Sequence, residues 1–192
     1  LHERYVREWL GAMATAGIVA IESDGRYALP QAHAALLARG GEMPMASSFQ
    51  FVAELGTVET RIVNCFHSGG GVPYEAYDRF HEIMAEESDL TVIAGLEEHV
   101  LPLAPGLIDL LHAGIDIADI GCGAGRAMNH LAGRFPNSRF TGFDLCAETV
   151  ERACREAKDA GLGNVRFVQA DASKLVGEEL FDLICTFDAI HD

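Results

Sequence analysis

The chain has 192 residues, of which 49% are hydrophobic, and its 29 acidic and 14 basic side chains give a net charge of −15. This length allows one larger domain or two small ones, and no apolar run approaches the roughly 20 residues that a membrane helix needs. The acidity disfavours a partner with a phosphate backbone. With no signal-peptide pattern and five cysteines that form no C-x-x-C pair, we expect a cytoplasmic protein with reduced thiols and no metal site.

Residues 1–40 form a first unit with a distinct order of elements. Apolar residues recur at helical spacing near its start, and Ser23-Asp24-Gly25 is a strong turn signal between two short apolar runs. The expected elements, in chain order, are a helix over 3–16, strands over 18–21 and 27–29, and a helix over 31–39. Helix, hairpin and helix together resemble part of a winged-helix domain, whose first helices would precede Leu1.

A winged helix suggests DNA binding, but the charge of this unit argues against it. Residues 1–40 hold four basic and four acidic side chains, whereas a DNA-reading surface normally carries a basic footprint. We therefore expect Tyr5 and Trp9 to be buried core residues or dimer contacts rather than groups that read bases. Nucleic acid is not an expected partner.

Residues 41–104 are expected to be a helical linker that covers a pocket. Apolar spacing predicts helices over 43–55, 58–66, 77–86 and 91–101. The run Ser68-Gly69-Gly70-Gly71-Val72-Pro73 interrupts them as a flexible break. Together with Tyr74, this run is either a mobile flap or an ordinary loop.

The strongest charge bias lies between Glu75 and Asp119. This stretch has eleven acids against Arg79 alone, a local net charge of −10. It is either a solvated helical surface that favours solubility, or an acidic approach to a site that favours cationic or neutral substrates. The sequence leaves both interpretations open.

The most informative motif is Asp119-Ile120-Gly121-Cys122-Gly123-Ala124-Gly125. It ends an apolar run that we expect to be a buried strand, and a helix is expected after it over 127–135. Glycines permit a tight turn and a close approach of the backbone to a ligand. The start of the helix offers free N–H groups and a partial positive charge, so the motif is suited to a nucleotide-like cofactor.

The spacing of the glycines distinguishes between cofactor classes. Dinucleotide-binding turns need G-x-G-x-x-G, with a third glycine that packs helix against strand. Here the pattern is G-x-G-x-G, and Arg126 follows it. A second strand is expected over 139–144 and ends in Asp144, about 20 residues after the turn, where a carboxylate that binds a ribose diol belongs. Because the third glycine of the dinucleotide pattern is absent and Arg126 follows the turn, a nicotinamide-dependent oxidoreductase is a less favoured hypothesis.

These motifs resemble those of the class I S-adenosylmethionine-dependent methyltransferases. The glycine motif is similar to their first motif, and Phe143-Asp144-Leu145 is similar to their second. Residues 165–172 look like their third strand and adenine-contacting turn, and residues 181–192 look like their fourth strand and its active-site edge. The resemblance covers roughly residues 104–192 and implies an α/β, Rossmann-like doubly wound sheet, partial, with about four parallel strands.

The resemblance also implies a domain organisation. We expect a winged-helix-like domain over 1–40, a linker over 41–104 and a Rossmann-like S-adenosylmethionine-binding domain over 105–192. In methyltransferases of this build the N-terminal domain serves dimerisation and shapes the pocket. A homodimer that acts on a small molecule is therefore expected.

S-adenosylmethionine is the cofactor that the resemblance implies, and each matching residue takes a role toward it. The methionine part would be surrounded by Asp119, Gly121, Cys122, Gly123 and Gly125, the ribose held by Asp144, the adenine contacted by Leu145, Asp171 and Ala172, and the substrate opening lined by Thr186, Phe187 and Asp188.

Methyl transfer makes few chemical demands on the protein. It is an in-line displacement with a good leaving group, so the protein mainly aligns the nucleophile with the methyl group. A base is useful only where the nucleophile must lose a proton. His191, three residues after Asp188, is the candidate for this base or for a substrate-orienting group, with Asp192 as a partner that orients it. The alternative is a structural histidine.

The chain departs from the family pattern in its number of strands. A complete class I sheet has more strands than these, so the strand over 181–187 would keep one open edge. We expect a fragment of a longer protein; a partner chain that supplies the rest, or a decayed gene product, are the alternatives. The expected function is methyl transfer to a small molecule, and the alternative is a winged-helix regulator with an α/β ligand sensor.

Overall fold

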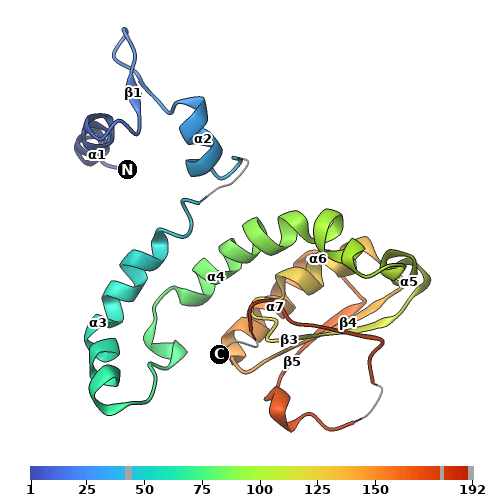
Figure 1. The fold of residues 1–192 in the computed structure, drawn as a ribbon. Helices are drawn as coiled ribbons and strands as arrows, with labels where there is room; N and C mark the ends of the chain where they lie inside the picture. Colours follow the sequence, from blue (N-terminus) through green and yellow to red (C-terminus); the bar gives the residue numbers. More distant parts are fainter. Residues whose placement is uncertain (42–44, 178–179, 190–192) are drawn as a thin grey trace. The chain divides into compact units, whose positions relative to one another are not determined.

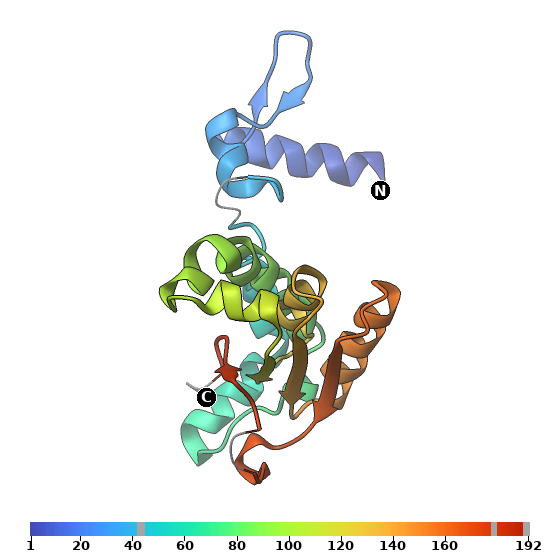
Figure 2. The ribbon, with the colours of Figure 1, turned by 90° about the vertical axis from the view of Figure 1, so that its right-hand side faces the viewer.

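The computed structural model describes residues 1–41, 45–177 and 180–189. They divide into two compact units, Leu1–Gly56 and Thr57–Asp192, which are described separately. Figure 1 follows the elements along the chain, and Figure 2 shows the same ribbon from the side. The boundary between the units falls within helix α3 (Gln50–Ser68).

The first unit contains the expected helix, hairpin and helix. Its elements are α1 (Glu3–Thr15), β1 (Ala20–Ile21), β2 (Tyr27–Ala28) and α2 (Gln31–Leu37). The strands pair antiparallel, with Ala20 opposite Ala28. Asp24 stabilises the turn by accepting a hydrogen bond from the backbone N–H of Arg26. Both strands are shorter than predicted at their outer ends. The N–H groups of Ile18 and Val19 donate to the carbonyl of Met13 in α1 instead of pairing in the hairpin.

The expectation that Tyr5 and Trp9 are buried core residues is wrong. The two side chains are 76% and 58% exposed, and α1 has no buried residue. A unit this small buries only a limited fraction of its surface, so large side chains on its helices stay exposed. The alternative role of both residues as dimer contacts stays a prediction.

The helices that precede the sheet differ in detail from the expected ones. The structure has α3 (Gln50–Ser68), η1 (Tyr74–Ala76), α4 (Phe80–Ser88), η2 (Asp89–Ile93), η3 (Leu96–Val100), η4 (Leu101–Leu103) and α5 (Leu107–Ala113). The two helices expected over 43–55 and 58–66 are one helix from residue 50 onward, because a single glycine, Gly56, costs a helix only about 1 kcal/mol. The helix expected over 91–101 consists of two π-helical turns, η2 and η3, on either side of Gly95.

The second unit is built on a parallel sheet, as expected. Its strands are β3 (Asp116–Ile120), β4 (Arg139–Asp144), β5 (Val165–Gln169) and β6 (Leu183–Cys185), in the order β5-β4-β3-β6. All three pairings are parallel. Helices α6 (Arg126–Arg134) and α7 (Ala147–Asp159) connect β3 to β4 and β4 to β5. This is the Rossmann-like arrangement that the sequence predicted.

The core lies between the sheet and these two helices. Figure 2 shows α7, in orange, along one side of the strands, and α7 contacts both β4 and β5. Each helix has one small or apolar buried stripe: Ala127, Met128, Leu131 and Ala132 on α6, and Thr149, Val150, Ala153 and Ala157 on α7. Burying a large apolar side chain stabilises a fold by about 1.5–3 kcal/mol, so this packing fixes the helices on the sheet.

β6 is the edge strand on one side of the described sheet. Its central residue, Ile184, is 63% exposed. The open edge expected for the fourth strand is therefore confirmed for the described residues. No helix of the described residues is long and apolar enough to cross a membrane.

Candidate functional site

The carboxyl ends of the strands bring the predicted motifs to one edge of the sheet. Strands that run parallel have their carboxyl ends at the same edge, where open α/β sheets bind ligands. The register places Ile120 opposite Phe143, and Asp144 opposite Gln169. Asp119 lies opposite Cys185 on the other side of β3. The segments that follow β3, β4, β5 and β6 therefore share this edge.

The glycine turn and the acid after β4 are joined by a hydrogen bond. The backbone N–H of Gly123 donates to Oδ2 of Asp144 over 2.8 Å. The N–H groups of Gly121 and Cys122 both donate to the carbonyl of Phe143, at 2.8 and 3.0 Å. The two elements that the sequence predicts to cooperate are thus in direct contact, although 21 positions separate the bonded residues.

Two of the glycines in the turn have different surroundings. Gly125 precedes α6 with φ +70°, and a Cβ there would lie 2.5 Å from the Phe167 ring and 2.7 Å from Ala153. Gly123 has φ +53°, and a Cβ there would meet nothing within 4 Å. Gly125 is therefore needed for packing of helix against sheet, whereas Gly123 borders open space.

Asp144 is held by several donors at once. Its Oδ1 accepts hydrogen bonds from the backbone N–H of Cys146 at 2.9 Å and from the hydroxyl of Thr149 at 3.2 Å. A carboxylate has about four lone-pair sites, so acceptor capacity remains for a further donor. Leu145, the next residue, is 68% exposed at this edge. A fixed acid beside a free apolar side chain is suited to a sugar joined to a flat ring.

Asp171 lies after β5 and organises its own turn. Its carboxylate accepts from the N–H and the hydroxyl of Ser173 at 3.0 and 2.6 Å, and it forms an ion pair with Lys174 at 2.8 Å. The hydrogen bond from Lys174, followed by those from Ser173, lowers the pKa of Asp171 to about 2. Ala172 begins the 3₁₀ turn η5 (Ala172–Lys174) that this carboxylate caps.

Asp119 is the buried acid of the site. It is 2% exposed, and its Oδ1 has no hydrogen-bond partner. Burial, followed by repulsion from Asp144, raises the pKa of Asp119 to about 7. Burial likewise raises the pKa of the Cys122 thiol. An unsatisfied buried carboxyl is costly and indicates a missing partner.

The segment after β6 reaches the glycine turn. A Cβ on Gly121 would lie 2.4 Å from the Cβ of Ala189, so the two backbones approach closely. Asp188 has a left-handed backbone with φ +56°, which is unusual for a residue with a side chain. Phe187 packs against the core, and the Thr186 hydroxyl is buried without a hydrogen-bond partner. His191 and Asp192 lie outside the described residues.

One residue beside this edge, His81, is not among the site residues that the sequence predicts. Nε2 of His81, on α4, lies 3.5 Å from Sγ of Cys146, two positions after Asp144. The His81 ring also contacts Tyr74 and Phe80, with ring centroids 5.7 and 5.8 Å apart. No spacing in the sequence signals this contact, because 65 positions separate the histidine from the cysteine.

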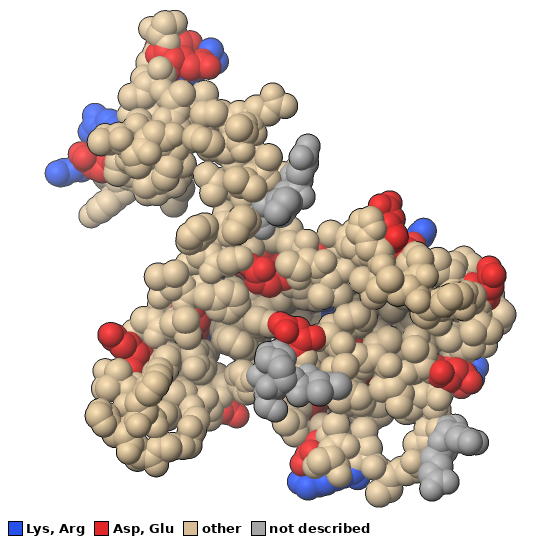
Figure 3. All heavy atoms as spheres, viewed as in Figure 1, with Lys and Arg blue, Asp and Glu red and all other residues tan. Residues whose placement is uncertain are grey.

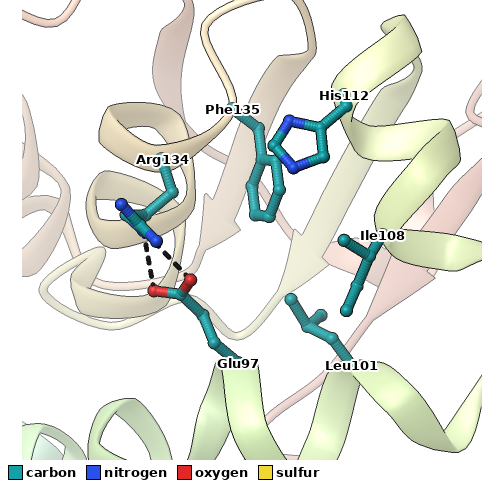
Figure 4. A pocket seen from close by; sticks show the side chains of 6 residues that line it. All are labelled: Glu97, Leu101, Ile108, His112, Arg134 and Phe135. Atoms are coloured by element: carbon teal, nitrogen blue, oxygen red, sulfur yellow. Dashed lines mark hydrogen bonds and ion pairs between the residues drawn. The ribbon is translucent and has the colours of Figure 1, made fainter.

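A cavity of about 290 Å³ lies at the opposite end of α6. Its lining residues are Glu97, Leu101, Ile108, His112, Arg134 and Phe135. Figure 4 shows the Glu97–Arg134 pair on one side, at 2.9 and 3.0 Å, and the His112 ring against Phe135. Because α6 begins at the glycine turn and ends here, this cavity is not part of the motif-bearing edge.

Several acids of the stretch from Glu75 to Asp119 have basic partners in the fold. Their ion pairs are Glu82–Arg79, Asp89–Arg126, Glu97–Arg134 and Asp116–Arg139. Figure 3 shows acidic side chains scattered over the visible face rather than gathered in one patch. These four of the eleven acids thus have ion-pair partners, and both interpretations of this stretch stay predictions. Among the described residues, no group of three or more His, Cys, Asp or Glu side chains is arranged to hold a metal ion.

Comparison with known proteins identifies two domains. Residues 117–192 match a family model described as a methyltransferase domain, and residues 1–39 match an Rv2258c-like winged HTH domain. A tRNA (guanine-N(7)-)-methyltransferase of Brevibacillus brevis is 48% identical over 63 residues, which cover 33% of this chain and 28% of the relative. A trans-aconitate 2-methyltransferase of Streptomyces coelicolor is 41% identical over 69 residues, which cover 35% and 23%.

Among solved structures, coclaurine N-methyltransferase bound to N-methylheliamine and SAH aligns with a TM-score of 0.37. The identity is 26%, over 41% of this chain and 26% of that one. The matches to the two curated relatives span about a quarter of each relative's length. Residues 1–39 thus belong to the Rv2258c-like winged helix-turn-helix domains, and residues 117–192 belong to the methyltransferase domains with a Rossmann-like sheet.

Proposed function

We propose that this protein binds S-adenosylmethionine at the carboxyl edge of its parallel sheet and transfers the methyl group to a small molecule. The hydrogen bond between Gly123 and Asp144 carries the proposal, because it unites a glycine turn with the acid of the next strand. The matched methyltransferase domain over 117–192 supports it.

The residues at this edge fit such a cofactor in three respects. Asp119 offers a buried oxygen without a partner, which suits a cationic group. Gly123 leaves its open side to a ligand. Leu145 is an exposed apolar side chain beside the anchored carboxylate of Asp144, which suits an adenine next to a ribose.

We assign the cofactor contacts accordingly. The methionine part is held by Asp119, Gly121, Cys122, Gly123 and Gly125, the ribose by Asp144, the adenine by Leu145, Asp171 and Ala172, and the methyl-bearing end by Phe187 and Asp188. The bonds already made by Asp144 and Asp171 to the protein hold these acceptors rigid before the cofactor arrives, which reduces the cost of binding.

The chemistry that the cofactor supplies is a methyl group on a positively charged sulfur that leaves readily. The chain's own task is to hold the acceptor in line with that methyl group. His191 is the proposed base or orienting group for acceptors that must lose a proton. The Thr186 hydroxyl, buried without a partner, is available to a ligand beside the same edge.

A small-molecule acceptor agrees better with the charge of the chain than a nucleic acid does. The net charge of −15 repels a phosphate backbone. The similar proteins include both tRNA and small-molecule methyltransferases, so similarity alone does not select the acceptor. We also propose a cytoplasmic homodimer formed through the N-terminal region, with domains over 1–40, 41–104 and 105–192.

Titration calorimetry with S-adenosylmethionine and S-adenosylhomocysteine tests the proposal. We expect Asp144→Ala to weaken binding by about 10- to 100-fold, because charge-assisted hydrogen bonds contribute about 1.5–3 kcal/mol. Asp116→Ala is the matched control, since Asp116 begins the same sheet at the opposite end of β3. Circular dichroism confirms that each variant folds. Absence of binding to the folded chain, or equal binding by Asp144→Ala, would refute the proposal.

The winged helix-turn-helix match over 1–39 supports a second candidate, a DNA-binding regulator that senses a ligand through its α/β domain. The equal numbers of basic and acidic residues in 1–40 argue against it. Gel-shift assays with genomic fragments at several salt concentrations distinguish the two. Tight binding that weakens steeply with salt favours the regulator.

A further inference from the structure

We infer that cofactor binding expels one proton from the protein, and that this proton comes from Asp119. At mildly acidic pH Asp119 of the ligand-free protein is a neutral carboxylic acid; when the ammonium group at the amino-acid end of the ligand enters, the acid ionises and pairs with that ammonium. The inference rests on the proposed function, and it concerns how pH regulates the same site.

The position of Asp119 carries the inference. It is the penultimate residue of β3, buried to 2% exposure beside the glycine turn. Its Oδ1 has no partner, whereas Asp144 on the next strand has three donors within hydrogen-bond distance. An ionised, unpaired carboxylate in such a place is far more costly than a neutral one.

The groups that face Asp119 supply no positive charge. Asp144 approaches from the end of β4, Cys122 from the glycine turn and Cys185 from β6. One is an acid and two are thiols whose own pKa values are raised by burial, that of Cys185 to about 11. Asp188 follows β6 and is acidic as well. Among the described residues, no Lys, Arg or His forms an ion pair with Asp119.

The ammonium group of the ligand reverses this balance. A positive charge close to a buried carboxyl favours its ionised form. By linkage, the ligand then binds more tightly as pH rises toward the value at which the empty protein releases the same proton, here about 7. Below that pH the affinity falls by about tenfold for each pH unit, and above it the affinity is constant.

Calorimetry in buffers with different enthalpies of ionisation measures the proton directly. At about pH 6, S-adenosylhomocysteine binding should release close to one proton, and at about pH 8.5 almost none. S-adenosylhomocysteine has the ammonium but no sulfonium, and adenosine has neither. We therefore expect release with S-adenosylhomocysteine and S-adenosylmethionine, and none with adenosine.

Two variants test whether the released proton comes from Asp119. Asp119→Asn should abolish the release and make the affinity independent of pH over this range. Asp116→Asn, at the other end of β3, should leave the release unchanged. Release that persists in Asp119→Asn would overturn the inference.

A second measurement decides the matter if Asp119→Asn does not bind. Aspartate labelled at its carboxyl carbon is followed by NMR in the empty wild-type protein. We expect one resonance with a midpoint near 7 that is absent from Asp119→Asn. If every aspartate titrates in the ordinary acidic range, the inference is wrong.

The failure of this inference is distinguishable from the failure of the proposed function. Binding without proton release at about pH 6 overturns the inference alone. Absence of binding to the folded protein overturns the proposed function, and the inference with it.

Discussion

Replacing Gly125 by alanine tests how the glycine turn is supported. Gly125 precedes α6 with φ +70°, a conformation that L side chains rarely adopt. The new Cβ would lie 2.5 Å from the Phe167 ring on β5 and 2.7 Å from Ala153 on α7. Phe167 is 9% exposed and Ala153 is fully buried, so neither has room to move.

The expected cost has two parts. The left-handed backbone costs about 1–2 kcal/mol for a residue with a Cβ. Overpacking of a filled core adds about 1–3 kcal/mol, and the lower entropy of the unfolded alanine chain returns about 0.4–1 kcal/mol. We therefore expect Gly125→Ala to lower the free energy of unfolding by about 2–4 kcal/mol, a large part of the stability of a typical domain.

Gly123→Ala is the matched control, because Gly123 has φ +53° but no atom within 4 Å of the added Cβ. It keeps the backbone strain and lacks the clash, so it should cost about 1 kcal/mol. Gly133→Ala, within α6 and with its nearest neighbour at 3.8 Å, should stabilise by up to about 1 kcal/mol.

Urea unfolding followed by far-ultraviolet circular dichroism measures these differences. The only tryptophan, Trp9, lies in the other unit, so its fluorescence does not report on the sheet. Amide hydrogen exchange of peptides from β3 to β5 assigns the change to the second unit. If Gly125→Ala is no less stable than Gly123→Ala, the packing explanation for this glycine is refuted.

Three further predictions follow from the same geometry. Asp119→Asn should stabilise the ligand-free protein at about pH 8 by at most about 4 kcal/mol. The pKa of Asp119 is raised to about 7 in the folded protein, compared with about 4 in the unfolded chain. As the pH rises from about 4 to 7, the unfolded chain therefore loses the proton first, and the wild-type folded state loses stability relative to it. Unfolding by urea at several pH values tests this, and a gain that does not shrink toward pH 4 contradicts it. Asn164→Ala should destabilise by about 1–3 kcal/mol, because the Asn164 amide nitrogen lies 3.0, 3.1 and 3.2 Å from three backbone carbonyl oxygens; an unchanged urea midpoint would count against it. Gly123→Ala should weaken S-adenosylhomocysteine binding more than Gly125→Ala does, because of these two glycines only Gly123 borders open space. Calorimetry measures both affinities, each corrected for the fraction of the variant that is folded.

The sequence predicted the parallel sheet well because its signals are local. The strand expected over 139–144 has those bounds in the structure, and the turn at Gly125 marks the start of α6. Apolar runs and glycines report on the backbone of their own segment, and parallel strands joined by helices leave few topologies. The glycine turn and Asp144 were likewise predicted to cooperate, and a hydrogen bond joins them.

The local sequence signals did not predict features that depend on packing against other segments, such as helix boundaries and the burial of side chains. The helices expected on either side of Gly56 are one helix, and the stretch over 91–101 consists of π-helical turns. Tyr5 and Trp9 look like core residues in the helical pattern of α1, yet both are exposed. Apolar spacing specifies which face of a helix is apolar but not what covers that face.

From the sequence alone, this protein has a cofactor-type glycine turn followed by an acid at the spacing of a ribose-binding strand, because both are properties of short segments. Only the tertiary structure decided that Asp119 is buried without a partner for its Oδ1, that His81 meets Cys146, and that acids such as Asp89 have partners on other helices. Burial and charge pairing depend on segments that are distant in the chain. The low dielectric inside the fold then determines which of those acids have a shifted pKa.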